Sequence, residues 1–285
     1  MTSSLIDRRR WLGASLLAAA VGPAPATAAA EPVRTALEPT AQTTEGPYYF
    51  DAGQQRAHIS AGLAGVPLEL RFSLLDTSGR RRAETRVDVW HCDARGIYSG
   101  YAGQGDERRI DTRGQDFLRG TQHSGTDGTA VFRTIYPGWY RGRTTHIHVK
   151  VFNGSRAVLT TQFFLPDALS EYLYTRLPDY ARKALRDTLN SGDGIALQAG
   201  GSVIGAVHER ADCYVASLDL VIDPAADPVV DRPPMPGDGP PTDARAGRPP
   251  PGGPRLRPGV PPGMGAALDG PERLAALVPP FKRAR

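Results

Sequence analysis

Two histidines separated by a single residue, His146 and His148, are the first residues in the sequence that could bind a metal. The β-branched and aromatic residues at 149–152 favour a strand, in which side chains two positions apart point to the same face. Two neutral imidazoles on one face are a frequent beginning of a transition-metal site. Taken alone, such a pair is more often structural or solvent-facing than metal-binding.

Tyrosines near these histidines strengthen the case for a metal. Tyr140 precedes His146 just after a Pro-Gly turn, and Tyr98 follows a second turn at 93–96. A phenol suits a hard, highly charged ion such as Fe(III), which lowers the phenol pKa far below its free value of about 10. No carboxylate stands at ligand spacing beside the histidines. That absence argues against the arrangement of two histidines and one carboxylate found in ferrous oxygenases.

Three longer motifs contain these residues, at 87–98, 132–140 and 143–148. They resemble the intradiol ring-cleavage dioxygenases, the protocatechuate and catechol dioxygenase family. The resemblance extends from a motif at 43–49 to about Ile222. The segments at 186–190 and 193–195 are most similar to the exported, single-domain branch of that family.

The resemblance implies one ferric ion per chain, with a catechol-type substrate and dioxygen as reactants. It implies cleavage between the two hydroxyls, which yields a cis,cis-muconate-type diacid and serves aromatic compound catabolism. The implied metal ligands are Tyr98, Tyr140, His146 and His148.

Two further residues are implied to act without binding the metal. Arg143 would stabilise negative charge that develops on the substrate, and Gln162 would orient the substrate. Tyr140 would be the ligand that leaves and accepts a proton. Tyr48 is a candidate substrate-binding residue, although its Gly-Pro-Tyr motif also fits an aromatic clamp on the N-terminal arm.

The sequence departs from better-known members of the family in two places. Only Arg141 and Gly142 separate Tyr140 from Arg143, and an N-terminal helical dimerisation region is missing. These differences predict a shallower, more open site and do not identify the catechol that is the substrate. A homodimer is possible. Two alternatives remain: a non-catalytic exported module that binds metal or ligand, and a module that attaches to envelope polymers through its tail.

Short segments bounded by turn residues predict an all-β fold, an antiparallel β-sandwich with one short helix and long active-site loops. The helix is expected at 180–189, with Asp179 as its N-cap. An irregular insertion at 100–125 would form the pocket rim, where Arg119 or His123 is either solvated or in contact with substrate. The predicted strands lie at 68–75, 85–92, 129–135, 145–152, 158–165, 203–208 and 214–222.

Composition divides the chain into three parts. Residues 1–30 resemble a twin-arginine export signal, with a Sec signal as the alternative, and their apolar run is too short for a stable membrane anchor. Residues 31–222 form the β-sandwich domain. Residues 223–285 hold most of the 26 prolines and predict a disordered tail.

The net charge of +4 comes without a basic run, which argues against nucleic acid as a partner. Cys92 and Cys213 could pair after export, or remain free.

Overall fold

Apolar residues alternate along the strands and build a buried layer between two sheets. The computed structural model describes residues 36–227 and residue 277. In strand β1 (Pro67–Asp76), Leu68, Leu70, Phe72 and Leu74 are fully or almost fully buried, as the period of two requires. They belong to one hydrophobic core that includes apolar side chains from both sheets. The predicted all-β sandwich is confirmed.

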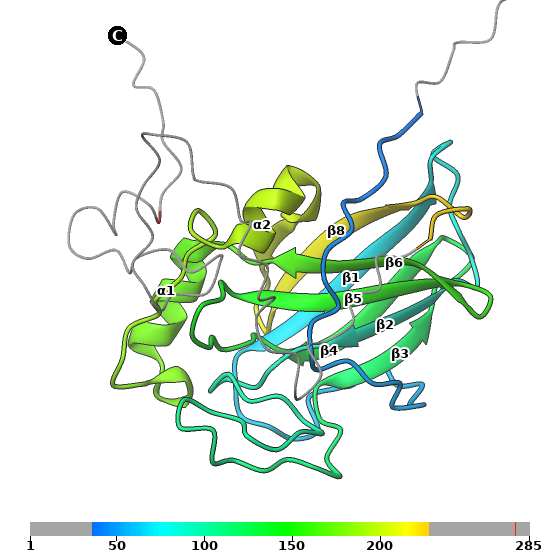
Figure 1. Cartoon of the computed structure of the whole chain (residues 1–285). Coiled ribbons are helices and arrows are strands. Elements are labelled where there is room, and N and C mark those ends of the chain that lie inside the picture. Colours follow the sequence, from blue (N-terminus) through cyan, green and yellow to red (C-terminus); the bar gives the residue numbers. More distant parts are fainter. Residues whose placement is uncertain (1–35, 228–276, 278–285) are drawn as a thin grey trace, which may run out of the picture. The chain divides into compact units, whose positions relative to one another are not determined.

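Each sheet has four strands, in the orders β4-β1-β8-β7 and β3-β2-β5-β6 (Figure 1). Most neighbours are antiparallel, but β1 and β8 pair in parallel, which departs from the expected purely antiparallel arrangement. The remaining strands are β2 (Arg86–Trp90), β3 (Arg119–His123), β4 (Thr129–Ile135), β5 (His146–Asn153), β6 (Arg156–Phe164), β7 (Ala206–Glu209) and β8 (Tyr214–Ile222).

The second sheet has two different faces. In β5, Ile147, Val149 and Val151 point into the core between the sheets. The period of two then places His146 and His148 on the opposite, outer face, where connecting segments cover them. The candidate site therefore lies outside the sandwich, on a sheet whose inner face is held rigid by packing.

The helices differ from the prediction. The segment at 180–189 is not helical beyond a short 3₁₀ turn at Pro178–Tyr180. Elsewhere in the described residues the chain forms α1 (Asp167–Arg176) and α2 (Gly194–Ala199), with a 3₁₀ turn at Gly200–Val203 after α2. Strand β3 lies within the insertion at 100–125, which was expected to be irregular throughout.

The predicted export signal at 1–30 lies outside the described residues, as does the predicted tail apart from residues 223–227 and residue 277. Residues 223–227 are described, and Arg156 donates hydrogen bonds to the carbonyls of Pro224 and Ala225. Within the described part of the chain, no helix is both long enough and apolar enough to cross a membrane.

Candidate metal centre

A row of side chains crosses the outer face of the second sheet and supports the candidate site. Trp90 on β2 is the register partner of His148 on β5, and His148 is the partner of Gln162 on β6. The indole of Trp90 stacks on the imidazole of His148, with ring centroids 4.7 Å apart and planes 11° apart. The sheet and this stack together fix the orientation of the His148 ring.

His146 is at the centre of the arrangement. Its Nδ1 lies 2.7 Å from the carbonyl oxygen of Thr144. A carbonyl can only accept, so Nδ1 carries the proton and Nε2 presents a lone pair. Around this Nε2 lie Tyr140 Oη at 3.1 Å, His148 Nε2 at 3.2 Å and Tyr98 Oη at 3.4 Å. The fold thus brings the four predicted ligand side chains together at one point.

Tyr98 is held by the turn that precedes it. The carboxylate of Asp93 accepts hydrogen bonds from the backbone N–H groups of Arg95 and Ile97, both at 2.8 Å. The amide of Tyr98 donates to the side-chain oxygen of Gln104 at 3.1 Å, and its carbonyl accepts from the hydroxyl of Thr112 at 2.7 Å. The Tyr98 side chain is 1% exposed, so its position is determined from all sides.

Tyr140 approaches from a second turn that packs on the first. The amide of Gly138 donates to the carbonyl of Asp93 at 2.9 Å. A Cβ atom at Gly138 would lie 2.3 Å from the carbonyl oxygen of Ala94, so only glycine permits this approach. Two segments that are distant in sequence thus deliver one phenol each.

Burial sets the protonation states of the four groups. It lowers the pKa of His146 to about 3, with the nearby Arg143 charge adding to the effect, and it holds the pKa of His148 well below its ordinary value. Both imidazoles are therefore neutral, which is the form that binds metals. Burial raises the pKa of Tyr140 to about 12 and that of Tyr98 further above its ordinary range. Without a cation, both phenols keep their protons.

These residues fit a ferric ion. Ligand distances of about 2 Å place neighbouring donor atoms about 3 Å apart around a common ion, close to the 3.1–3.4 Å found here. Only a strongly charged cation would deprotonate two buried phenols. Among the described residues, no group of three or more His, Cys, Asp and Glu side chains could hold a metal. The two tyrosines are therefore needed to complete a ligand set.

Arg143 and Gln162 lie beside this centre and contact each other. Nη2 of Arg143 donates to Oε1 of Gln162, and Nε of Arg143 donates to Oδ2 of Asp193 at 2.8 Å. Gln162 is fully buried, and its Nε2 donates to the carbonyl of Thr44 at 2.9 Å. Both ends of the Gln162 amide are thus used within the protein, so it positions Arg143 rather than reaching into open space.

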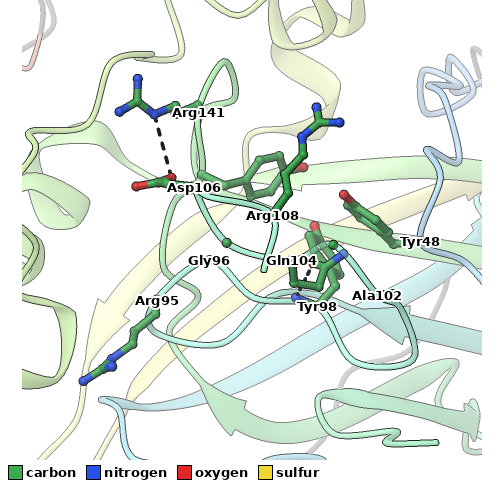
Figure 2. A pocket seen from close by; sticks show the side chains of 12 residues that line it. Tyr48, Arg95, Gly96, Tyr98, Ala102, Gln104, Asp106, Arg108 and Arg141 are labelled. Atoms are coloured by element: carbon green, nitrogen blue, oxygen red, sulfur yellow. Dashed lines mark hydrogen bonds and ion pairs between the residues drawn. The ribbon is translucent and has the colours of Figure 1, made fainter. Parts of the chain in front are cut away.

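A cavity of about 570 Å³ opens over the two phenols. Tyr48 lines it and stacks on Tyr98, with ring centroids 4.6 Å apart and planes 28° apart (Figure 2). Part of the insertion, at 102–108, forms the rim, as expected from the sequence. Asp106 and Arg141 form an ion pair across this rim. Arg141, in the short link after Tyr140, is itself part of the cavity lining.

The alternatives left open for Arg119, His123 and the two cysteines have different outcomes. Arg119 is buried rather than solvated: its Nε donates to Ser99 Oγ at 2.8 Å, and its guanidinium lies 4.2 Å from the Phe50 ring centroid. His123 lies at the end of β3, close to Gln55. Cys92 and Cys213 are both free thiols.

Asp193 lies at this site, although its sequence motif at 193–195 predicts no role for it there. Its Oδ1 accepts from the amides of Ile195 and Ala196 and so caps α2. The signal that was available is an aspartate directly before a short helix-forming run, the usual N-cap pattern. Its contact with Arg143 could not be read from that pattern.

Comparison with solved structures places this fold among known enzymes. The structure is similar to an intradiol ring-cleavage dioxygenase from Tetranychus urticae, with a TM-score of 0.60 and 28% sequence identity. The match covers 68% of this chain and 98% of that one. Nearly the whole of the solved enzyme therefore corresponds to the β-sandwich described here.

Comparison of sequences finds related enzymes at low identity. A catechol 1,2-dioxygenase of Acinetobacter lwoffii is 28% identical over 148 residues, which cover 44% of this chain and 45% of the relative. A catechol 1,2-dioxygenase of Acinetobacter baylyi is 25% identical over 218 residues, which cover 68% and 67%. The chain spans about half the length of most of the curated relatives it matches. No protein-family model matches it.

Proposed function

The chain belongs to the intradiol ring-cleavage dioxygenase family, and from this premise we propose that it is a non-haem Fe(III) enzyme. It cleaves the ring of a catechol between the two hydroxyls with dioxygen and releases a cis,cis-muconate-type diacid. The observation that carries the proposal is the convergence of two phenols and a second imidazole on Nε2 of His146.

One ferric ion per chain would be held by Tyr98, Tyr140, His146 and His148. When bound, it supplies a chelation site for both substrate hydroxyls and draws electron density from the ring, which makes the ring reactive toward dioxygen. The buried neutral imidazoles and the cavity over the phenols support this assignment.

The two tyrosines are suited to different parts in proton transfer. Tyr98 is buried, and both its backbone groups are hydrogen-bonded to neighbouring side chains. Tyr140 is only half-buried, lines the cavity and precedes the exposed Arg141. Tyr140 Oη, as a phenolate, would accept the proton that a catechol hydroxyl gives up, because Tyr140 is the more exposed of the two tyrosines.

Arg143 supplies the fixed positive charge beside the reacting atoms. Its guanidinium stays protonated, because an arginine keeps its proton at any accessible pH and the carboxylate of Asp193 lies 2.8 Å from its Nε. Such a charge stabilises negative charge that develops on the substrate oxygens. Tyr48 would bind the substrate by contact with its ring, since it forms an aromatic wall of the cavity.

The experiment that tests the proposal measures metal, colour and turnover of the purified protein together. We expect about one iron per chain, a red-brown tyrosinate-to-iron absorbance band, oxygen uptake with catechol or a substituted catechol, and a ring-opened diacid by mass spectrometry. A colourless protein that contains zinc would contradict the metal. A coloured protein without oxygen uptake on any catechol would point to the non-catalytic binding module.

Export by the twin-arginine route is part of the proposal. It is supported by the arginines at 8–10 and by the need of a metalloprotein to fold around its ion before transport. Arg8→Lys/Arg9→Lys should retain the precursor in the cytoplasm. Undiminished export of this variant would favour a Sec signal.

A further inference from the structure

The carboxylate of Asp193 is buried beside the proposed metal centre, and both of its oxygens accept hydrogen bonds from the protein. Oδ2 accepts from Arg143 Nε at 2.8 Å and from the amide of Thr144 at 2.9 Å. Oδ1 accepts from the amides of Ile195 and Ala196 at 2.9 and 3.2 Å. A carboxylate has about four lone-pair sites, so every one is occupied by a protein donor. This group cannot bind a metal or substrate without giving up one of those bonds.

These four bonds connect two separate parts of the fold. One oxygen holds the first turn of α2, and the other holds the two residues just before Thr145 and His146, where β5 begins. The segment that carries Asp193 is itself tied to this strand, because Thr144 Oγ1 donates to Oδ1 of Asn190 at 2.8 Å. Asp193 therefore has a fixed position relative to the metal-binding strand.

Two side chains hold the guanidinium of Arg143 by hydrogen bonds. Asp193 holds its Nε, and Gln162 Oε1 accepts from its Nη2. Two contacts at different nitrogens fix both the position and the rotation of a planar guanidinium. Within the described part of the chain, Nη1 has no hydrogen-bond partner, so it is the nitrogen left to meet a substrate oxygen.

We propose that Asp193 is a positioning residue for the proposed reaction, and that with Gln162 it forms a clamp that aims Nη1 of Arg143 at the substrate. This inference rests on the proposed function, because it assigns the clamp to a catalytic arginine. Asp193 acts through Arg143 and touches neither the metal ligands' donor atoms nor the cavity.

The clamp also balances charge. Arg143 lies mostly out of solvent, and an arginine in such surroundings needs a nearby anion to stay in place. Replacing Asp193 by asparagine keeps an oxygen acceptor and nearly the same shape but removes the negative charge. With the remaining oxygen on the amides of α2, the asparagine NH2 would face Arg143 and could not accept from it. Gln162 alone would then hold Arg143, which would be free to rotate toward water.

The test is a kinetic double-mutant cycle with Asp193→Asn, Arg143→Ala and the double variant, on iron-loaded protein with catechol. We expect Asp193→Asn to lower kcat at least tenfold with KM changed less than about threefold. In the Arg143→Ala background the same change should lower kcat less than about twofold. Added methylguanidinium should restore part of the activity of Arg143→Ala but not of the double variant, since the carboxylate that would bind it is gone.

Asp187→Asn is the matched control. Asp187 lies in the same segment and accepts from the amide of Gly142 at 3.0 Å, but it does not contact Arg143. Its loss should leave kcat within about threefold. Iron content and the absorbance band should be unchanged in both asparagine variants. Thermal unfolding of the four proteins of the cycle gives a readout that needs no turnover: Asp193→Asn should lower Tm more in the wild-type background than in Arg143→Ala.

The outcomes separate the two ideas. A wild-type protein without turnover on catechols would refute the proposed function, while the Tm cycle would still show whether the pair is coupled. An active wild type with full kcat in Asp193→Asn would overturn the positioning role. Equal losses from Asp193→Asn in both backgrounds would also overturn it, because Asp193 would then act on the fold and not through Arg143.

Discussion

Gly96 tests how the turns position the phenols. It has φ +83°, and a Cβ atom there would lie 2.1 Å from the carbonyl oxygen of Trp139 and 3.3 Å from Cβ of Tyr140. Gly96→Ala would therefore force apart the two turns that deliver Tyr98 and Tyr140. The contact is with backbone, so no side-chain rotation can relieve it.

The expected cost has two parts. A left-handed conformation costs a non-glycine residue roughly 1–2 kcal/mol, and an overpacked contact costs roughly 1–3 kcal/mol more. Gly114 provides the matched control, since its φ is +79° but a Cβ atom there would meet nothing within 4 Å. We expect Gly114→Ala to lose about 1 kcal/mol of unfolding free energy and Gly96→Ala about 3 kcal/mol.

Urea unfolding and iron content of the two variants provide the assay. Gly96→Ala should be the less stable protein and should also bind less iron, because two donor atoms are displaced. Gly114→Ala should keep its iron. Equal stabilities together with full iron in Gly96→Ala would refute the reasoning that the contact of these turns sets the donor geometry.

The remaining predictions concern single side chains. Arg143→Ala should keep iron and colour but lower kcat about a hundredfold, since one charged donor contributes on the order of 3 kcal/mol; full activity would move the role elsewhere. Tyr48→Ala should raise KM for catechol several-fold with iron unchanged, because the aromatic wall is lost; an unaltered KM would leave Tyr48 as a clamp. Burial lowers the pKa of His91 from 6.5 to about 4. As the pH falls below 6.5, His91 takes up a proton in the unfolded chain before it does so in the folded protein. Protonation therefore favours unfolding, and the free energy of unfolding decreases between pH 6.5 and about pH 4. His91→Gln should reduce this acid-induced loss by about 3 kcal/mol in urea unfolding at the two pH values, and an unchanged loss would contradict it.

Strands were predictable where alternation is strong. β4 and β8 have the expected bounds, because their apolar residues face one core and turn residues bracket them. β3 (Arg119–His123) was missed, since its sequence has no apolar side chain and it is recruited by pairing with β2. Its pairing partners, not its own propensity, make it a strand.

The helix error has a tertiary cause. The segment 180–189 has helical spacing, but Arg186 is fully buried in an ion pair with Asp167, while Leu185 is exposed. The buried ion pair of Arg186, and not the spacing of the apolar residues, therefore determines the conformation of this segment. α1 (Asp167–Arg176) lacks a side-chain cap and begins after Pro166, so it offered little local signal.

Residue types and spacing were sufficient to nominate the four donor side chains, because two turns and one strand carry them within short motifs. Contacts between distant segments were not readable in the same way. Asp193 contacts Arg143, which is 50 positions away in the sequence. Arg119 is buried against the ring of Phe50, although a charged residue is usually expected at the surface. Such pairings depend on the folded sheet.

Resonance Raman spectroscopy of the purified protein, excited in its visible band, tests most directly whether two phenolates and two imidazoles bind a ferric ion. Tyrosinate ring vibrations should be enhanced in the wild type. They should weaken but persist in Tyr140→Phe, because Tyr98 still binds, and they should disappear with the iron in Tyr98→Phe. A visible band without tyrosinate vibrations, or an iron content and spectrum unchanged in Tyr98→Phe, would contradict the ligand assignment.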